Sequence, residues 1–81
     1  MAFYTYTLVS EKTGRRYFGS CEDLQLRLAR HNAGQVRSTK AFIPYRLFYH
    51  EEFATREEAL RQEKFFKSVD GYRYLQSKSI I

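Results

Sequence analysis

Five residues of this chain carry side chains that together can cleave a phosphodiester bond. They are Tyr6, Tyr17, Arg27, His31 and Glu63. An arginine suits two-pronged recognition of a phosphate, and a histidine can shuttle a proton near neutral pH. A carboxylate can hold a metal ion, and a tyrosine, with an ordinary pKa of about 10, needs a metal-bound water or a nearby cation to act as a base. No one of them is diagnostic alone, so the elements that position them decide whether they form a site.

Glu63 is the least expected of the five, because it interrupts the apolar stripe of a predicted helix. The stripe is formed by Ala59, Leu60, Phe66 and Val69. A carboxylate on a buried stripe costs several kcal/mol unless it is paired or binds a metal. Two interpretations follow: Glu63 is a metal ligand, or it lies at the edge of the stripe and pairs with a neighbouring arginine.

Arg27 and His31 are four residues apart in another predicted helix, so their side chains lie on one face. Arg30 lies close to the same face. One interpretation is a helix face that points into a phosphate-binding groove. The other is an ordinary solvated face, which is common for charged residues at this spacing.

Tyr6 and Tyr17 lie on the two arms of a predicted hairpin, where they can be neighbours. Strands favour tyrosine for packing, and that is the ordinary explanation of both. The arms run from Phe3 to Ser10 and from Arg15 to Ser20, and they are joined by a turn that contains Gly14. Each arm is rich in aromatic or β-branched residues.

The first helix is predicted to begin near Asp23 and to stop before Gly34. Ser20 and Asp23 have the spacing of a capping box, with Asp in place of the usual Glu. Leu24 and Leu28 supply its apolar face. A polar loop over residues 35–44 follows.

The third strand is predicted from Tyr45 to Phe53. Leu47, Tyr49 and Glu51 are expected on one face and Phe48 on the other.

Thr55 begins the second helix, and Thr55-x-x-Glu58 is a capping box. This helix is predicted to run to about Ser68. Asp70-Gly71 is expected to break it, and the segment from Tyr72 to Lys78 is expected to form a short last helix.

The predicted order is β-β-α-β-α with a short C-terminal helix, which indicates an α+β fold. A small, mostly antiparallel three-stranded sheet flanked by helices is the economical arrangement. At 81 residues the chain is expected to form a single domain over residues 1–81.

The composition favours an anionic partner. Fourteen Lys and Arg residues against nine Asp and Glu give a formal charge of +5, which favours nucleic acid, although solubility alone explains such a charge in many small domains. Cys21 is the only cysteine, which excludes an intramolecular disulfide and a Cys-x-x-Cys zinc site and fits a reducing cytoplasm. Neither a signal peptide nor a membrane-spanning run is expected.

Read together, these residues resemble the GIY-YIG endonuclease superfamily in its small stand-alone bacterial form. Tyr17-Phe18-Gly19-Ser20 matches the second signature tripeptide and the residue after it, and Tyr4-Thr5-Tyr6 takes the place of the first. His31-Asn32-Ala33-Gly34 and Arg37-Ser38-Thr39-Lys40 match segments common in stand-alone members. The stretch from Ala59 to Lys64 matches the helix that carries the glutamate of the family. The resemblance extends from about Phe3 to Leu75.

The resemblance implies hydrolysis of DNA phosphodiesters with one divalent metal, usually Mg²⁺, for which Mn²⁺ can substitute. Glu63 would hold the metal, with water completing its shell. Tyr6 or Tyr17 would deprotonate or orient the attacking water, and the sequence does not decide between them. Arg27 would neutralise charge on the scissile phosphate, and His31 would assist proton transfer or phosphate binding.

Phosphate contacts are expected from basic residues spread along the chain. These are Arg15, Arg16, Arg27, Arg30, Arg37, Lys40, Lys64 and Lys67. Such contacts are salt-sensitive and carry no base information, so binding is expected to be weak and independent of sequence, with branched, nicked or single-stranded DNA as preferred substrates in repair or turnover. A protein partner that adds affinity for DNA fits the same expectation. The alternatives are a non-catalytic nucleic-acid-binding module and a protein-interaction domain.

Overall fold

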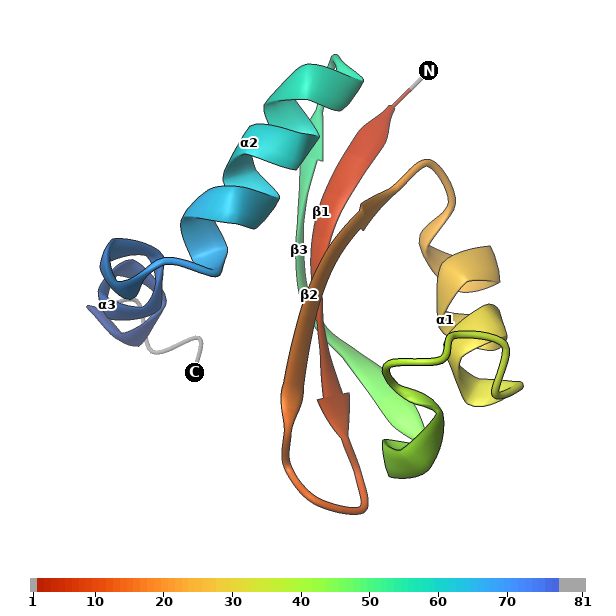
Figure 1. Cartoon of the computed structure of the whole chain (residues 1–81). Coiled ribbons are helices and arrows are strands. Elements are labelled where there is room, and N and C mark those ends of the chain that lie inside the picture. The colour runs from red at the N-terminus through yellow and green to blue at the C-terminus, as the bar shows by residue number, and fades with distance from the viewer. Residues whose placement is uncertain (1, 78–81) are drawn as a thin grey trace.

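The computed structural model describes residues 2–77 and forms a three-stranded sheet with helices on both faces (Figure 1). The elements in chain order are β1 (Phe3–Ser10), β2 (Arg16–Cys21), α1 (Leu24–Asn32), the 3-10 helix η1 (Lys40–Phe42), β3 (Tyr45–Phe53), α2 (Arg56–Phe66) and α3 (Val69–Ser77). The sheet order is β2-β1-β3, and both strand pairs are antiparallel. The predicted α+β class and the antiparallel three-stranded sheet are confirmed.

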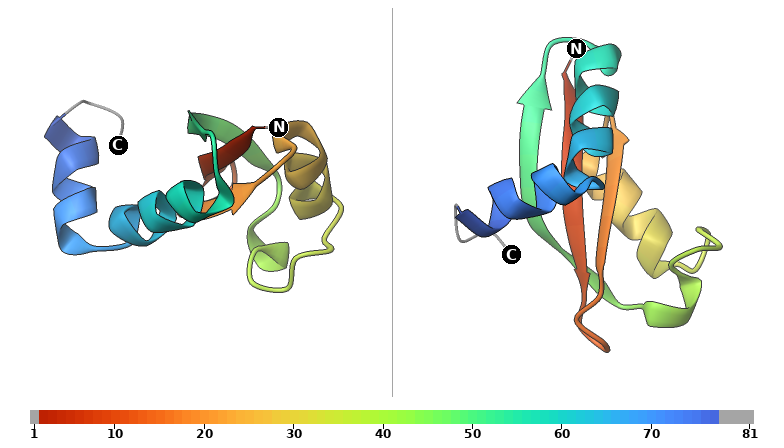
Figure 2. Two further views of the ribbon diagram at one scale, coloured as in Figure 1. Left: turned by 90° about the horizontal axis from the view of Figure 1, so that it is seen from above. Right: turned by 60° about the vertical axis from the view of Figure 1, so that its left-hand side comes forward.

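Helices α1 and α2 cover opposite faces of the sheet, as the views in Figure 2 show. Thr5 on β1 donates a hydrogen bond from Oγ1 to the carbonyl of Ala59 on α2, at 2.6 Å. Its neighbour Tyr6 projects to the other face, where its phenol meets His31 of α1. Because successive strand residues alternate between faces, β1 contributes alternately to two separate packing layers.

Both predicted helix starts are present, but the first helix is capped by a different residue. Asp23 is itself the N-cap, and its Oδ1 accepts the N–H of Leu26 at 3.0 Å. Ser20 lies within β2, so the predicted capping role of Ser20 is wrong. At the start of α2, Thr55 Oγ1 accepts the N–H of Glu58, as the capping box predicts.

A β-bulge in the β1–β3 pair changes which face the side chains of β3 occupy. Leu8 pairs with Leu47, but the preceding residue Thr7 pairs with Tyr49, so Phe48 is the extra residue. Leu47 therefore lies on the α1 face, whereas Tyr49 lies on the α2 face, where its ring contacts Phe66. The prediction that Leu47, Tyr49 and Glu51 share one face is wrong for Leu47.

The C-terminal helix begins earlier than predicted. Gly71 lies within α3, and the chain breaks instead after α2, at Lys67 and Ser68. A methyl group on Gly71 would lie 1.7 Å from the backbone oxygen of Phe65. Gly71 therefore permits close approach of α3 to the end of α2 and does not terminate a helix. The last residue of the predicted helix, Lys78, lies outside the described residues.

The end of α1 is tied to the start of β3 by one side chain. Asn32 Oδ1 accepts the backbone N–H of Tyr45 at 2.6 Å, and Asn32 Nδ2 donates to the Tyr45 carbonyl at 2.9 Å. The amide thus satisfies the backbone N–H and C=O of Tyr45 and ties the end of α1, next to His31, to the edge strand β3. No helix within residues 2–77 is long and apolar enough to cross a membrane.

Candidate active site

The α1 face of the sheet holds a buried line of polar side chains. The phenol oxygen of Tyr6 lies 3.2 Å from Nε2 of His31, and Nδ1 of the same ring lies 2.8 Å from Oγ1 of Thr39. All three residues are at most 1% exposed. His31 is therefore neither on a solvated helix face nor, unlike Arg27 and Arg30 of the same face, on the wall of a pocket, so the groove interpretation holds for the two arginines and not for His31.

Gly19 makes room for the Tyr6 ring. The two residues are directly opposite in the β1–β2 ladder, and a methyl group on Gly19 would lie 2.4 Å from the Tyr6 phenol oxygen. No side chain larger than hydrogen fits while the phenol reaches His31. This close approach gives a physical reason for the glycine in Tyr17-Phe18-Gly19.

Tyr17 completes an aromatic enclosure around His31. Its ring centroid lies 4.9 Å from that of His31 in an edge-on arrangement and 6.3 Å from that of Tyr6 in a stacked one. Tyr45 closes a further side at 6.1 Å from His31. Tyr17 is only half-buried, in contrast to Tyr6. The expectation that Tyr6 and Tyr17 are neighbours on the hairpin is confirmed.

Burial and Arg27 together set the ionisation of this cluster. Burial raises the pKa of Tyr6 well above its ordinary value, while the positive charge of Arg27 acts in the opposite direction. The pKa of His31 is lowered, first by burial and then by the positive charge of Arg27. His31 is consequently neutral at physiological pH.

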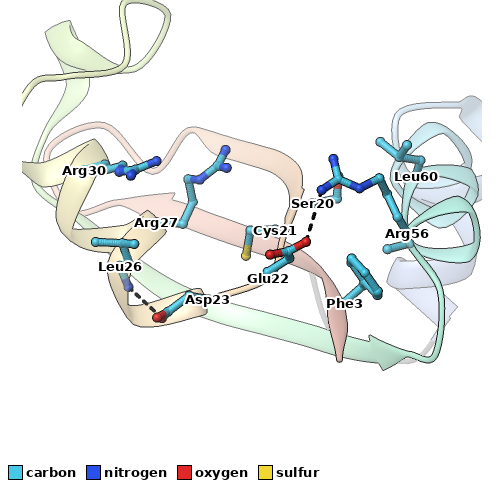
Figure 3. Close-up of a pocket in the computed structure, with 11 residues that line it drawn as sticks. Phe3, Ser20, Cys21, Glu22, Asp23, Leu26, Arg27, Arg30, Arg56 and Leu60 are labelled. Carbon is cyan, nitrogen blue, oxygen red and sulfur yellow. Dashed lines mark hydrogen bonds and ion pairs between the residues drawn. The ribbon is translucent and has the colours of Figure 1, made fainter. Parts of the chain in front are cut away.

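Arg27 also lines a pocket that extends from α1 to α2 past the end of the edge strand β2 (Figure 3). Its volume is about 320 Å³. Three guanidinium groups lie around it, contributed by Arg27, Arg30 and Arg56. Ser20 and Cys21 of β2 lie between the two helices. Since β2 is an edge strand, groups from both faces of the sheet can reach this pocket.

Glu63 lies on α2, the helix on the other face of the sheet from His31. It follows two pocket residues, Ala59 and Leu60, by four and three positions, which places it next to them one turn further along the helix. The Glu63 side chain is 19% exposed, and its Oε2 accepts from Lys67 Nζ at 2.7 Å.

The apolar stripe on α2 is narrower than the sequence predicts. Ala59 and Phe66 are 1% exposed, but Leu60 is 41% exposed, and Val69 belongs to α3. Glu63 is therefore at the rim of the buried stripe, as one of the two interpretations expects, although its partner is a lysine and not an arginine.

The structure thus brings together four of the five predicted site residues. Tyr6, Tyr17, Arg27 and His31 form one cluster on the α1 face. Glu63 lies apart from their direct contacts, beyond the pocket on α2. Within residues 2–77 no three His, Cys, Asp or Glu side chains converge as a metal cage. A single rim carboxylate suits a cation such as Mg²⁺, which keeps most of its water and needs one or two protein oxygens.

Of the basic residues predicted to contact phosphate, Arg27 is half-buried and the others are exposed, namely Arg15, Arg16, Arg30, Arg37, Lys40, Lys64 and Lys67. Some of them already have neighbours. The Arg15 guanidinium lies 4.4 Å from the centre of the Phe42 ring, and Lys67 pairs with Glu63. Arg30 is the one that lines the pocket beside Arg27.

Sequence reasoning missed two residues of the site. Arg56 lines the pocket from α2 and pairs with Glu22 at 3.1 Å. No sequence pattern links Arg56 to Arg27, because the two lie on different helices. Thr39 lies within the predicted basic loop, yet it is buried against His31. The only available signal was its place in Arg37-Ser38-Thr39-Lys40.

Comparison with known proteins agrees with this geometry. The model of the GIY-YIG catalytic domain family matches residues 2–74. A UPF0213 protein of Bacillus pumilus is 48% identical over 56 residues, which are 68% of this chain and 57% of that protein. A UPF0213 protein of Lacticaseibacillus paracasei is 38% identical over 72 residues, covering 88% of this chain and 80% of the relative. The matched stretch is thus little more than half of the Bacillus pumilus protein.

A solved structure shares the fold. The solution NMR structure of the UPF0213 protein BH0048 from Bacillus halodurans has a TM-score of 0.54 and 32% sequence identity, and the match covers 95% of this chain and 84% of that one. Since the family model spans residues 2–74 and includes both tyrosine segments, Arg27, His31 and Glu63, this chain belongs to the GIY-YIG catalytic domain family, a family of nuclease-type domains.

Proposed function

We propose that this protein is a divalent-metal-dependent endonuclease that hydrolyses DNA phosphodiester bonds, with branched, nicked or otherwise unusual DNA in repair or turnover as its substrate. The observation that carries the proposal is the buried pair of Tyr6 and His31 beside Arg27, which itself lines a pocket with two further arginines. The lone thiol of Cys21 fits action in the cytoplasm.

In this proposal Arg27 binds the scissile phosphate. It is half-buried at the pocket wall, where a preorganised guanidinium stabilises developing negative charge more strongly than in bulk water. Tyr6 or Tyr17 orients the attacking water and accepts its proton. When Tyr6 accepts that proton, its own phenol hydrogen passes to Nε2 of the neutral His31, which lies 3.2 Å away.

Glu63 is the residue that would hold the metal. Its carboxylate is at the rim of α2, one turn from the pocket residues, and exchanging the exposed Lys67 for a cation costs little, because surface ion pairs contribute about 0–1 kcal/mol. When bound, a divalent cation lowers the pKa of coordinated water and neutralises phosphate charge.

The DNA strand is proposed to lie along the pocket, with Arg30 and Arg56 contacting phosphates on either side of Arg27. The pair of Arg56 with Glu22 is exposed, so it gives way easily to a phosphate. Affinity should fall steeply with salt. Three phosphate contacts predict a loss of roughly 40-fold between 50 and 200 mM salt.

The test is cleavage of labelled duplex, nicked, flap, four-way-junction and single-stranded DNA, and of RNA, with Mg²⁺ or Mn²⁺. The wild type is compared with Glu63→Ala and, as a matched control, with Lys67→Ala, which breaks the same ion pair but keeps the carboxylate. We expect cleavage by the wild type and by Lys67→Ala and none by Glu63→Ala.

Binding without cleavage in any of the three proteins would overturn the nuclease proposal in favour of a non-catalytic nucleic-acid-binding module. Absence of both binding and cleavage would favour a protein-interaction domain, or a domain that depends on a partner for its grip on DNA. Equal cleavage by wild type and Glu63→Ala would remove the metal role of Glu63.

A further inference from the structure

The line of contacts from Thr39 to Tyr6 has a direction that can be worked out from its donors and acceptors. We infer that Thr39 is a positioning residue, which fixes His31 in the tautomer protonated on Nδ1 and thereby directs the phenol hydrogen of Tyr6 toward His31 Nε2. The inference rests on the proposed function, since Thr39 would act through Tyr6 and Arg27 and not on the substrate.

The direction of the hydrogen bonds along this line is set at Thr39. Thr39 Oγ1 lies 3.3 Å from the backbone oxygen of Val36, and a carbonyl can only accept a hydrogen bond. The hydroxyl has one hydrogen, which it donates to Val36. With its hydrogen on Val36, whose oxygen also accepts the backbone N–H groups of Thr39 and Lys40, the Thr39 oxygen accepts at the 2.8 Å contact with His31 and Nδ1 carries the ring hydrogen.

The other end of the line then follows. A neutral imidazole with hydrogen on Nδ1 has an acceptor at Nε2, and the Tyr6 hydroxyl, 3.2 Å away, donates to it. The positive charge of Arg27 acts on the same phenol from outside this line and favours its ionised form. Three side chains thus form one oriented line, from Tyr6 through His31 to Thr39.

The surroundings of His31 leave Thr39 as the group that chooses the tautomer. The groups that the structure places against the ring are Tyr6, Tyr17, Tyr45, Thr39 and Arg27. None of them is negatively charged at neutral pH, so no carboxylate in this set holds a second proton on the ring. Tyr17 and Tyr45 contact the ring as aromatic neighbours, while Thr39 makes the contact to Nδ1.

The test is the His31 tautomer, read from long-range ¹H–¹⁵N NMR correlations of the ring nitrogens. The protein has two histidines, and the exposed His50 serves as the reference in the same spectrum, with His50→Gln for assignment. The variants are Thr39→Val, which has nearly the same shape but no hydroxyl, and Thr39→Ser, which keeps the hydroxyl. Thermal unfolding checks that both variants fold, and Thr39→Ala replaces Thr39→Val should the latter fail to fold.

We expect hydrogen on Nδ1 in the wild type and in Thr39→Ser, and a shift of the hydrogen toward Nε2 in Thr39→Val. Cleavage should fall roughly 10- to 100-fold in Thr39→Val and recover in Thr39→Ser, part of the contribution of a positioned proton-transfer group. Hydrogen on Nε2 in the wild type, or an unchanged tautomer in Thr39→Val, would overturn the inference. The NMR result does not depend on cleavage, so failure of the proposed function would be seen separately, in the Glu63→Ala comparison.

Discussion

On the α1 face of the sheet three buried polar side chains are bonded to one another, whereas on the α2 face the buried threonine that has a hydrogen-bond partner bonds to a helix backbone. Tyr6, His31 and Thr39 form a side-chain line that is almost completely buried. On the other face Thr5 bonds to the backbone of α2, and Phe66 fills the space between helix and sheet. The α2 carboxylate of interest, Glu63, is at the rim.

The difference shows where this small domain places its chemistry. A buried polar network is costly when it is partly satisfied and specific when it is complete, so the α1 face must be held accurately. The α2 face has only to pack and to carry one carboxylate beside the pocket. We therefore expect substitutions on the α1 face to change both activity and stability, and those on the α2 face to change stability alone, with Glu63 as the exception.

The largest expected effect is at Arg27. Arg27→Ala should slow cleavage roughly 10²- to 10³-fold, about 3–4 kcal/mol of barrier, because it removes a preorganised donor to the scissile phosphate. Its effect on the free energy of unfolding should be small. Single-turnover cleavage rates provide the measurement, and Arg30→Ala, in the same pocket, is the control that should lose mainly DNA affinity. Equal rates for the two variants would remove the special role of Arg27.

A smaller effect is expected at Gly19, which lies opposite Tyr6 in the β1–β2 strand pair. Gly19→Ala places a methyl group 2.4 Å from the Tyr6 phenol oxygen, so the ring must move away from His31. Overpacking of this kind costs about 1–3 kcal/mol. Urea unfolding should show the loss, and Ser20→Ala, the next residue on the opposite face, should show less. A Gly19→Ala protein as stable and active as the wild type would contradict the close approach of Tyr6.

Two threonines on the α2 face give a matched pair of stability tests. Thr5→Val removes the hydrogen bond to the carbonyl of Ala59 and should destabilise the protein by about 0.5–1.5 kcal/mol, the usual net contribution of one hydrogen bond. Thr7 is equally buried, but its hydroxyl has no hydrogen-bond partner among the described residues. Thr7→Val should therefore be neutral or stabilising by urea unfolding. The same loss in both variants would mean that the two hydroxyls are equivalent.

The smallest effect concerns pH. The pKa of His31 is lowered in the folded protein, so the unfolded chain binds more protons below its ordinary value of about 6.5. The free energy of unfolding should be at its full value above about pH 6.5 and fall as the pH is lowered below it, by at most about 1.4 kcal/mol per pH unit. Stability curves over pH 5–7 give the slope. This slope should persist in His50→Gln and disappear in His31→Gln. A slope that remained in His31→Gln would belong to the titration of another group.

Most of the fold could be predicted from local patterns. The hairpin, the third strand and the capping box at Thr55 follow from turn residues, alternation and caps, which act over a few residues. The β3 bulge and the early start of α3 could not be predicted in this way. The bulge depends on how β3 pairs with β1. Gly71 is found inside α3 because only a residue without a side chain lets this helix pack against the backbone of Phe65.

For the candidate site, too, some features follow from local sequence patterns and others depend on tertiary contacts. The sequence by itself determined which residue types are present and that Arg27 and His31 share a helix, because helix periodicity is a local property. Only the tertiary structure decided that His31 is buried against Thr39, that Gly19 lies beneath Tyr6 and that Arg56 joins Arg27 around one pocket. Each of these depends on contacts between segments far apart in the chain. Burial and electrostatic environment arise from such contacts, and no local pattern records them.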